Sequence, residues 1–445
     1  MLLRFRVENH RSLRDDAELS LIMSKARGAV PVGESWQDFT TRVAGVYGAN
    51  ASGKSNVLHA LDFMRSAVVH SATTWGSSEY FPYTPFSLNA ENPEKPSSYE
   101  VDLVVEGVRY TYGFESNRSG IVSEWLYSYP SRRRRTLFER ESGSDPEITF
   151  GRTLVGQNAT MSKLLRPTAL FLSVAANNNH PALTRVYHEF RKHFRYARFN
   201  ESDKQLRIRM MTDLISNETI ARQAQALLKF ADLGIAGVDV KEEELSNDFR
   251  STIERLISAV HGENAEGSDD QQNDKMVDKA IDDLRKQMRF LHAGESADGA
   301  LYDLGMKDQS AGTIAWLSIG VPALVSLRNG DVFMVDELDS SLHPRLTVTL
   351  IQMFKDPEIN PSGAQLVFTS HDASLLGTML GNVLNRDEIW FTEKQQDGAT
   401  DLYALQEFTT RKSDNFELRY LQGRYGAIPI IDHEELRAAL VVQET

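Results

Sequence analysis

The chain has 445 residues, of which 41% are hydrophobic and 25% are charged, a composition typical of a soluble globular protein with about two or three domains. It contains no cysteine, which excludes disulfides, thiol nucleophiles and cysteine-based zinc sites, and its formal net charge of −13 argues against non-specific coating of nucleic acid. No apolar run approaches the roughly 20 residues that span a bilayer, and the N-terminus lacks a signal-peptide pattern, so we expect a cytoplasmic protein without a membrane partner.

The first predicted elements are strands at Leu3–Glu8 and Ala17–Ile22, joined by the turn Asn9-His-Arg-Ser12. A short buried strand, Arg42–Tyr47, and a helix with apolar residues at helical spacing, Asn56–Arg65, follow. Between them lies a loop rich in glycine and small residues.

That loop, Gly48-Ala-Asn-Ala-Ser-Gly-Lys-Ser55, fits the P-loop pattern G-x-x-x-x-G-K-[ST] at every fixed position. Its backbone N–H groups can hold phosphates at a helix N-terminus, Lys54 can reach the β- and γ-phosphates, and Ser55 can hold Mg²⁺. An ordinary glycine-rich turn is the alternative. The predicted nucleotide-binding residues here are Gly48, Ala49, Asn50, Ala51, Ser52, Gly53, Lys54, Ser55 and Asn56.

The segment from 97 to 152 is rich in predicted strands. Tyr99–Val105 and Val108–Phe114 alternate and are joined by Glu106-Gly107, a tight hairpin signal. Glu124–Tyr129 and Ile148–Phe150 extend the same predicted sheet.

The periodicity then becomes helical up to about residue 290. Ala221–Leu233, Phe249–Val260 and Lys275–Met288 are predicted helices, and the acidic stretch 262–274 is a predicted disordered loop. Tyr187–Arg198 interleaves aromatic and basic residues, which is compatible with nucleic-acid contact or with an amphipathic element that has a solvated basic face.

A second half of a nucleotide site follows. Asp331–Glu337 reads as a buried parallel strand that ends in two acids, of which Asp336 would hold Mg²⁺ and Glu337 would polarise water. The distance of about 280 residues from the P-loop indicates an insertion between two halves of one domain.

Two further segments lie close to these acids in sequence. Gln309–Thr313 opens an apolar helix, so Ser310 and Gly312 mark either a second anion site or a simple helix cap. Gln365–Ser370 is another buried strand, and His371 at its end would face the γ-phosphate. Residues Ile389–Thr392 and Asp401–Leu405 read as a final hairpin around Asp397-Gly398.

This order of parts resembles the ABC-type ATPases of the SMC, RecF and OLD group. The matching segments are the P-loop at 48–55, a degenerate signature at 310–312, Walker B at 336–337, a D-loop at 338–342 and a switch His371. More narrowly, Phe171–Ala175, Leu228–Ile235, Phe391–Lys394 and Tyr420–Pro429 look like the RloA/AbiL abortive-infection ATPases of the AAA family. The chain departs from the pattern at the Q-loop, where Pro85-Phe-Ser-Leu88 stands without a glutamine.

The resemblance implies an α/β fold: an ABC-ATPase-like P-loop head with an antiparallel β subdomain and a helical insertion. It divides the chain into 1–160, the N-terminal half of the head, 161–295, the helical insertion, and 296–445, the C-terminal half. It also implies ATP and Mg²⁺ as ligands, with Lys54, Glu337 and His371 catalytic, Ser55 and Asp336 on the metal, and Ser310, Gly312 and Asp339 at the nucleotide.

The implied partners are a second copy of the chain, which completes the site, and an effector in trans. Only about 70 residues follow His371, without a D-x-D pair or an H-N-H pattern, so we expect no nuclease site in the chain itself. The resemblance implies a RloB-like TOPRIM nuclease as effector and a role in phage defence, with nucleic acid or a phage product as trigger. The alternative is a RecF- or SMC-like repair ATPase that acts on DNA directly.

Overall fold

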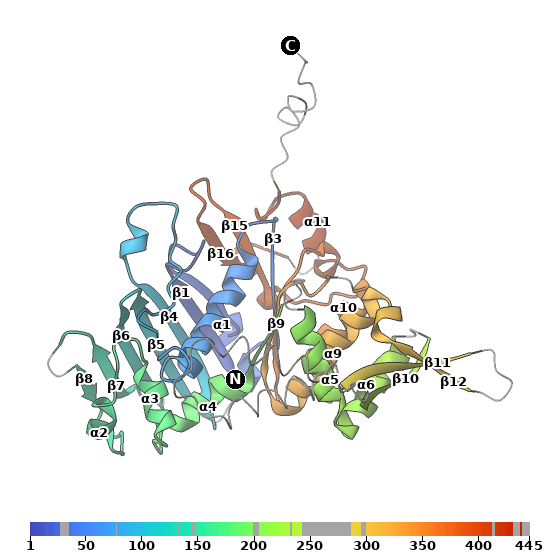
Figure 1. Cartoon of the computed structure of the whole chain (residues 1–445). Helices are drawn as coiled ribbons and strands as arrows, with labels where there is room; N and C mark the ends of the chain where they lie inside the picture. The colour runs from blue at the N-terminus through green and yellow to red at the C-terminus, as the bar shows by residue number, and fades with distance from the viewer. Residues whose placement is uncertain are drawn as a thin grey trace, which may run out of the picture. The chain divides into compact units, whose positions relative to one another are not determined.

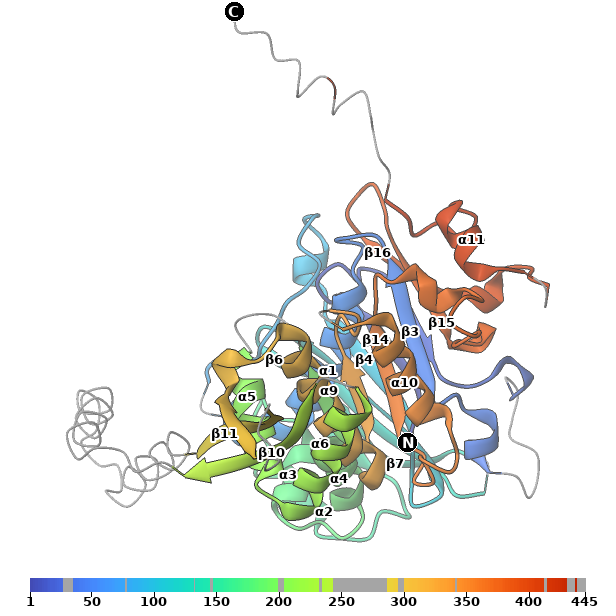
Figure 2. The same ribbon diagram turned by 90° about the vertical axis from the view of Figure 1, so that its right-hand side faces the viewer.

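The computed structural model describes residues 1–26, 35–76, 78–131, 133–144, 147–198, 204–231, 234–242, 286–294, 300–340, 342–411, 414–429 and 437 (Figures 1 and 2). The chain forms two compact units. Unit 1 comprises Met1–Arg198, Ser326–Asp339 and Thr347–Thr445, and unit 2 comprises Phe199–Val325 and Ser340–Leu346. The helix predicted at Phe249–Val260 and the loop predicted at 262–274 lie outside the described residues.

Unit 1 contains a seven-stranded antiparallel sheet with the order β2-β1-β4-β5-β6-β7-β8. Its strands are β1 (Leu2–Glu8), β2 (Ala17–Ser20), β4 (Ser97–Val105), β5 (Val108–Asn117), β6 (Gly120–Tyr129), β7 (Arg135–Glu141) and β8 (Ile148–Phe150). The hairpin predicted between β4 and β5 is confirmed, and Glu106 and Gly107 at its turn have φ values of 49° and 78°. Positive φ at both central residues matches the twist of the flanking strands.

The second sheet of unit 1 has the order β16-β15-β3-β14-β13-β9. Its strands are β3 (Val43–Gly48), β9 (Phe194–Ala197), β13 (Val332–Val335), β14 (Gln365–Thr369), β15 (Ile389–Lys394) and β16 (Thr400–Ala404). All neighbours are parallel except β15 and β16, which form the predicted hairpin. Every residue of β3, β13 and β14 is buried, as a parallel strand covered on both faces requires.

Unit 1 also contains helices. They are α1 (Lys54–His70), α2 (Asn158–Ser162), α3 (Phe171–Asn177), α4 (Leu183–His193), most of α10 (Pro344–Lys355) and α11 (Phe416–Leu421). Short 3-10 turns lie at Ser24–Ala26, Trp36–Phe39, Asn92–Glu94, Ala373–Leu376, Arg386–Glu388 and Leu405–Glu407. The predicted apolar face of α1 at Val57, Leu58, Leu61 and Met64 is buried in a core to which both sheets contribute.

A side-chain amide links the two sheets. Gln365, the first residue of β14, accepts a hydrogen bond from the Leu2 N–H at 2.7 Å and donates one to the Leu2 carbonyl at 2.8 Å. Both residues are almost fully buried. The amide thereby takes the place of a backbone partner at the start of β1.

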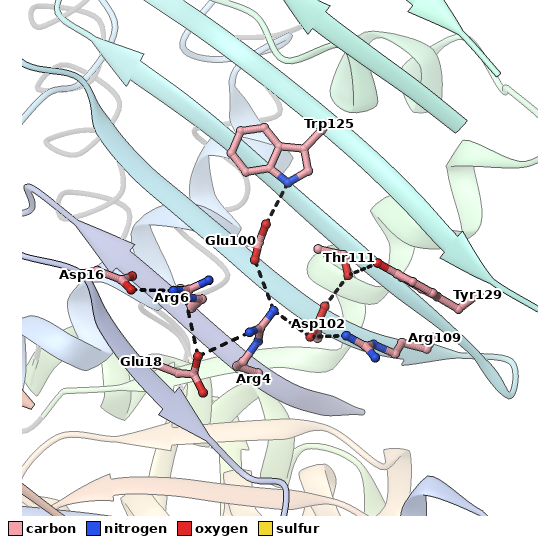
Figure 3. Close-up of polar contacts among 10 residues, drawn as sticks. All are labelled: Arg4, Arg6, Asp16, Glu18, Glu100, Asp102, Arg109, Thr111, Trp125 and Tyr129. Carbon is pink, nitrogen blue, oxygen red and sulfur yellow. Dashed lines mark hydrogen bonds and ion pairs between the residues drawn. The ribbon is translucent and has the colours of Figure 1, made fainter. Parts of the chain in front are cut away.

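A charge network covers the face of the antiparallel sheet opposite the buried Phe5 and Val7 (Figure 3). Its centre is the buried Asp102, which accepts hydrogen bonds from Arg109 and from the Thr111 hydroxyl and pairs with Arg4 at 3.1 Å. The outer members are Arg6, Asp16, Glu18, Glu100, Trp125 and Tyr129. The buried carboxylate is thus fully partnered, as burial of a charge requires.

Unit 2 contains helices and a sheet. The helices α5 (Lys204–Ile215), α6 (Glu218–Phe230), a short turn at Met306–Asp308 and most of α9 (Ala311–Asn329) accompany the strands β10 (Ile235–Glu242), β11 (Lys286–Ala293) and β12 (Leu301–Gly305). The predicted helix at Ala221–Leu233 is confirmed up to Phe230 as α6, and its last two residues lie outside the described residues. Of the helix predicted at Lys275–Met288, residues 275–285 also lie outside them, and the prediction is wrong for the last three residues, which begin β11 and pair with β10.

One observation bears on the predicted insertion at 161–295. Helices α3 and α4 and strand β9 belong to unit 1, because β9 pairs in parallel with β13 from Val332↔Phe194 to Val335↔Ala197.

Helix α9 is long and apolar enough to cross a membrane, but 61% of its most apolar window is buried inside the protein, as in the core helix of a soluble protein.

Candidate functional site

The carboxyl ends of three parallel strands bring most of the predicted site residues together. The P-loop follows β3, Asp336 and Glu337 follow β13, and His371 lies two residues after β14. Because β14 pairs with both β3 and β13, these three ends meet at one edge of the sheet. A cavity of about 540 Å³ lies there, lined by Ser12, Asn50, Ala51, Ser52, Gly53, Lys54, Ser55, Asn56, Glu337, His371 and Lys394.

The P-loop ends at a helix N-terminus without a side-chain cap. Gly53 is the N-cap residue of α1 and has φ 103°. It has no side chain that could accept a hydrogen bond from the N–H groups of the first helical turn. The backbone N–H groups there favour an anion, which is the feature that a P-loop uses to bind phosphates.

Lys54 is folded back onto its own loop. Its ammonium group donates hydrogen bonds to the carbonyl oxygens of Gly48 and Ala49 at 2.8 and 2.9 Å and lies 3.4 Å from His371 Nδ1. The side chain is almost fully buried, and this burial lowers the pKa of Lys54 to about 8, although the acids at 336, 337 and 339 oppose the shift. A phosphate in the cavity would offer the buried ammonium a charged partner that the two carbonyls do not provide.

The first acid after β13 meets two hydroxyl groups. Asp336 Oδ1 accepts hydrogen bonds from Ser55 at 2.9 Å and from Thr369 at 2.7 Å. A serine hydroxyl beside a carboxylate is a hard oxygen pair that suits Mg²⁺, whose remaining positions are commonly filled by phosphates and water. In the described part of the chain, no group of three or more His, Cys, Asp or Glu residues could hold a metal ion. The Ser55 hydroxyl and the Asp336 carboxylate would suit a magnesium ion that arrives with a nucleotide.

The second acid is turned out of the sheet. Glu337 is exposed and has φ 56°, while its N–H donates to the Thr369 hydroxyl at 2.7 Å. Left-handed φ at a non-glycine residue costs free energy and is commonly kept at functional sites. The Thr369 hydroxyl thus contacts both acidic residues: it accepts a hydrogen bond from the Glu337 N–H and donates one to the Asp336 carboxylate.

The remaining predicted residues are divided between the units. Asp339 Oδ1 accepts a hydrogen bond from the His371 N–H at 3.3 Å, which places it beside the cavity in unit 1. Ser310 and Gly312 lie in unit 2, where the Ser310 hydroxyl accepts from the Thr313 N–H at 3.0 Å and so caps α9. The helix start predicted at this signature is therefore observed, and its anion-binding role stays a prediction.

Sequence reasoning missed five residues at this site, namely Ser12, Thr369, Thr392, Lys394 and Thr400. Lys394 adds a second lysine to the cavity from the end of β15. Thr369 could have been found as the hydroxyl residue that ends the strand before His371. Thr392 lies in the segment Phe391–Lys394 that carries the family resemblance, but nothing local gives it a role at the site. Thr400 carries no local signal, since only the fold brings its hairpin to the P-loop.

A line of hydrogen bonds leads into the antiparallel sheet from Arg11, whose Nη1 lies 3.5 Å from Oδ1 of the cavity residue Asn56. Arg11 Nη2 lies 2.9 Å from His59 Nε2, His59 Nδ1 lies 2.9 Å from His10 Nε2, and His10 Nδ1 lies 2.8 Å from the Tyr99 hydroxyl. Burial lowers the pKa of His10 to about 3 and that of His59 to about 4, so both rings are neutral near pH 7. Because arginine can only donate, each ring carries its proton on Nδ1.

These features define the class of the protein: an α/β P-loop domain with Walker-type acids at the edge of a parallel sheet. The chain belongs to the family described as "AAA domain, putative AbiEii toxin, Type IV TA system", whose model matches residues 43–377. A comparison with curated proteins finds no match.

Two solved structures are similar to the chain. One is the SMC head bound to the C-terminal winged-helix domain of ScpA, with 11% identity over 91% of this chain and 97% of that one and a TM-score of 0.43. The other is the SMC head with an extended coiled coil from Pyrococcus furiosus, bound to the C-terminal domain of ScpA, with 11% identity over 95% and 99% and a TM-score of 0.37. Scores this low add nothing to the assignment, which rests on the family model and the sheet topology.

Proposed function

We propose that the chain binds ATP with Mg²⁺ and hydrolyses the bond between the β- and γ-phosphates. The observation that carries this proposal is that one cavity is lined by P-loop residues, including Lys54, together with Glu337 and His371. Phosphoryl transfer requires mainly positioning and neutralisation of charge, and the cavity collects the groups for both.

Each residue has a separate task in this proposal. The P-loop N–H groups and Lys54 bind the phosphates, and Lys54 exchanges the Gly48 and Ala49 carbonyls for phosphate oxygens. Ser55 and Asp336 hold Mg²⁺, which supplies charge neutralisation when it is bound. Glu337, the exposed one of the two acids, orients the attacking water. His371 forms a hydrogen bond with the γ-phosphate.

Binding and turnover of ATP by the purified chain test this proposal. We expect Lys54→Ala to abolish nucleotide binding, because no other buried cation lies on the P-loop in the described residues. We expect Glu337→Gln to keep ATP binding and to lower kcat by about 100-fold or more, since an oriented general base contributes on that order.

Glu358 offers a matched control, because it is exposed and follows α10 away from the cavity. Glu358→Gln should leave both binding and turnover unchanged. Turnover that survives Lys54→Ala and Glu337→Gln together would place the activity elsewhere and overturn the proposal.

We further propose that a second copy of the chain completes the site. Ser310 belongs to unit 2 and is exposed at the start of α9, so its side chain is accessible to a partner. In this arrangement the segment 310–312 of one copy caps the γ-phosphate bound by the other, and the assembly is a symmetric dimer.

We propose that the nucleotide state of this cytoplasmic dimer controls an effector protein in trans, of the TOPRIM nuclease class, in defence against phage. The description of the family as part of a toxin–antitoxin system supports a role of this kind. Cells that carry the chain with its neighbouring gene should plate phage less efficiently, and Lys54→Ala should remove the protection. Strong stimulation of the ATPase by DNA without any effector would favour direct action on DNA instead.

A further inference from the structure

Two threonines of the β15–β16 hairpin contact the P-loop. Thr392 Oγ1 lies 2.7 Å from Ser52 Oγ, and the Thr400 hydroxyl donates to the Ser52 carbonyl at 2.8 Å. Thr392 is 0% exposed, Thr400 3% and Ser52 2%. Both threonines lie outside residues 43–377, so the family match says nothing about them.

Ser12 extends this contact to the first turn of α1. Its hydroxyl lies 2.7 Å from Thr400 Oγ1 and accepts from Asn56 Nδ2 at 2.6 Å, and its carbonyl accepts from the Thr400 N–H at 2.7 Å. A hydroxyl has one hydrogen and two lone pairs, so Thr400 can serve Ser52 and Ser12 at the same time. The P-loop is thereby held at Ser52 and, through Ser12, at Asn56.

The two glycines of the P-loop leave room for these threonines. A Cβ atom on Gly53 would lie 2.2 Å from Thr400 Oγ1 and 2.9 Å from Ser12 Oγ, and one on Gly48 would lie 2.6 Å from Thr392 Oγ1. Such distances are far below contact distance. The glycines and the hydroxyl residues therefore form one complementary packed set.

A P-loop binds phosphates well only if its N–H groups already point into the site. A loop that is ordered before the ligand arrives loses less conformational entropy on binding, and the affinity rises accordingly. We propose that Thr392, Thr400 and Ser12 form a hydroxyl clamp that holds the P-loop in its phosphate-binding conformation. This inference rests on the proposed ATP site, and Thr392 and Thr400 act in it as positioning residues through Ser52.

The test compares Thr400→Val with the natural chain of 445 residues. Valine keeps the shape of threonine but leaves the Ser52 carbonyl without its partner. We expect the Kd for ATP, measured by titration with a fluorescent ATP analogue, to rise about fivefold to twentyfold, as for a buried carbonyl left unpaired. KM should rise with it while kcat stays within about twofold, because the catalytic groups are untouched.

Two variants separate positioning from general stability. Thr400→Ser keeps the hydroxyl and should restore the Kd to within about twofold of the natural value. Thr41→Val removes a hydroxyl bond of the same kind, at 3.2 Å to the Leu21 carbonyl, from an equally buried threonine at the other end of β3. It should lower the thermal midpoint and leave the Kd unchanged.

Amide hydrogen exchange without nucleotide gives a readout that does not depend on ATP. Thr400→Val should speed exchange in the peptide that contains residues 49–53, and Thr41→Val should not. Exchange in that peptide and a Kd that both match the natural chain would overturn the clamp. A natural chain that binds no ATP would instead overturn the proposed function, while the exchange result would still decide whether the clamp orders the loop.

Discussion

At the scale of single residues, the site is built from short polar contacts that local sequence patterns predict only in part. The P-loop, Asp336, Glu337 and His371 could be predicted because each follows a buried strand with a distinctive composition. Thr400 could not, since its role depends on contact with Ser52, which is 348 residues away in the chain. A sequence pattern predicts contacts between residues that are close in the chain, whereas these hydroxyl contacts form only when the sheet brings distant residues together.

The start of the Walker B strand carries a pH-sensitive contact. The buried Asp331 accepts a hydrogen bond from Arg195, and its Oδ1 lies 2.9 Å from His193 Nδ1. The hydrogen bond between Asp331 and His193 raises the pKa of His193. The charge of Glu189 also raises this pKa, while partial burial and the N-terminal ammonium oppose the shift. Because the folded pKa is raised, the stabilisation is fully present below the unfolded value of about 6.5 and is lost as the pH rises through the folded value.

We therefore expect His193→Gln to destabilise unit 1 at about pH 6 and to have a smaller effect at about pH 9. Since His193 is 35% exposed, the difference should be at most about 1 kcal/mol. Urea unfolding followed by tryptophan fluorescence at the two pH values measures it. An equal destabilisation at both pH values would show that the imidazolium contributes nothing.

At the scale of elements, most strands of unit 1 follow their sequence patterns, whereas β9 of unit 1 and β10 and β11 of unit 2 begin in the region whose periodicity predicted helices. Strands β3, β13 and β14 are buried along their whole length and were predicted. Strand β11 was predicted in part as a helix, because Lys275–Met288 mixes polar and apolar residues at helical spacing. Its partners β10 and β12 lie on either side of it in the sheet, and that pairing overrides a weak helical preference.

The junction between the two sheets of unit 1 gives an element-scale prediction. Gln365→Met preserves the size of the side chain but leaves the Leu2 N–H and carbonyl without partners. We expect the unfolding free energy of unit 1 to fall by roughly 2–6 kcal/mol, the sum for two buried polar groups at about 1–3 kcal/mol each. The urea-unfolding midpoint gives this value.

The exposed Gln352 on α10 provides the control for this substitution. Gln352→Met should change the unfolding free energy by less than about 0.5 kcal/mol, as surface substitutions usually do. If Gln365→Met behaved like Gln352→Met, the amide would not join the sheets in solution.

At the scale of the whole molecule, the proposed dimer links the two units through the nucleotide. Unit 1 holds the P-loop and both acids, and unit 2 holds Ser310 and Gly312. If the γ-phosphate bridges two copies, the dimer should form with ATP and separate after hydrolysis, since the bridge is then lost.

The mass of the chain in solution, measured by light scattering with and without ATP, tests this arrangement. Glu337→Gln should trap the dimer with ATP and Mg²⁺, because the phosphate stays in place. In that background Ser310→Arg should leave ATP binding within about twofold and prevent the dimer, because the larger charged side chain blocks the cap while the P-loop is unchanged. Ser216 follows α5 in the same unit with its hydroxyl bonded to the Thr212 carbonyl at 3.0 Å, and Ser216→Arg serves as the control for an added charge. A Ser310→Arg chain that hydrolyses ATP normally as a monomer would exclude a shared site and would leave each P-loop to act alone.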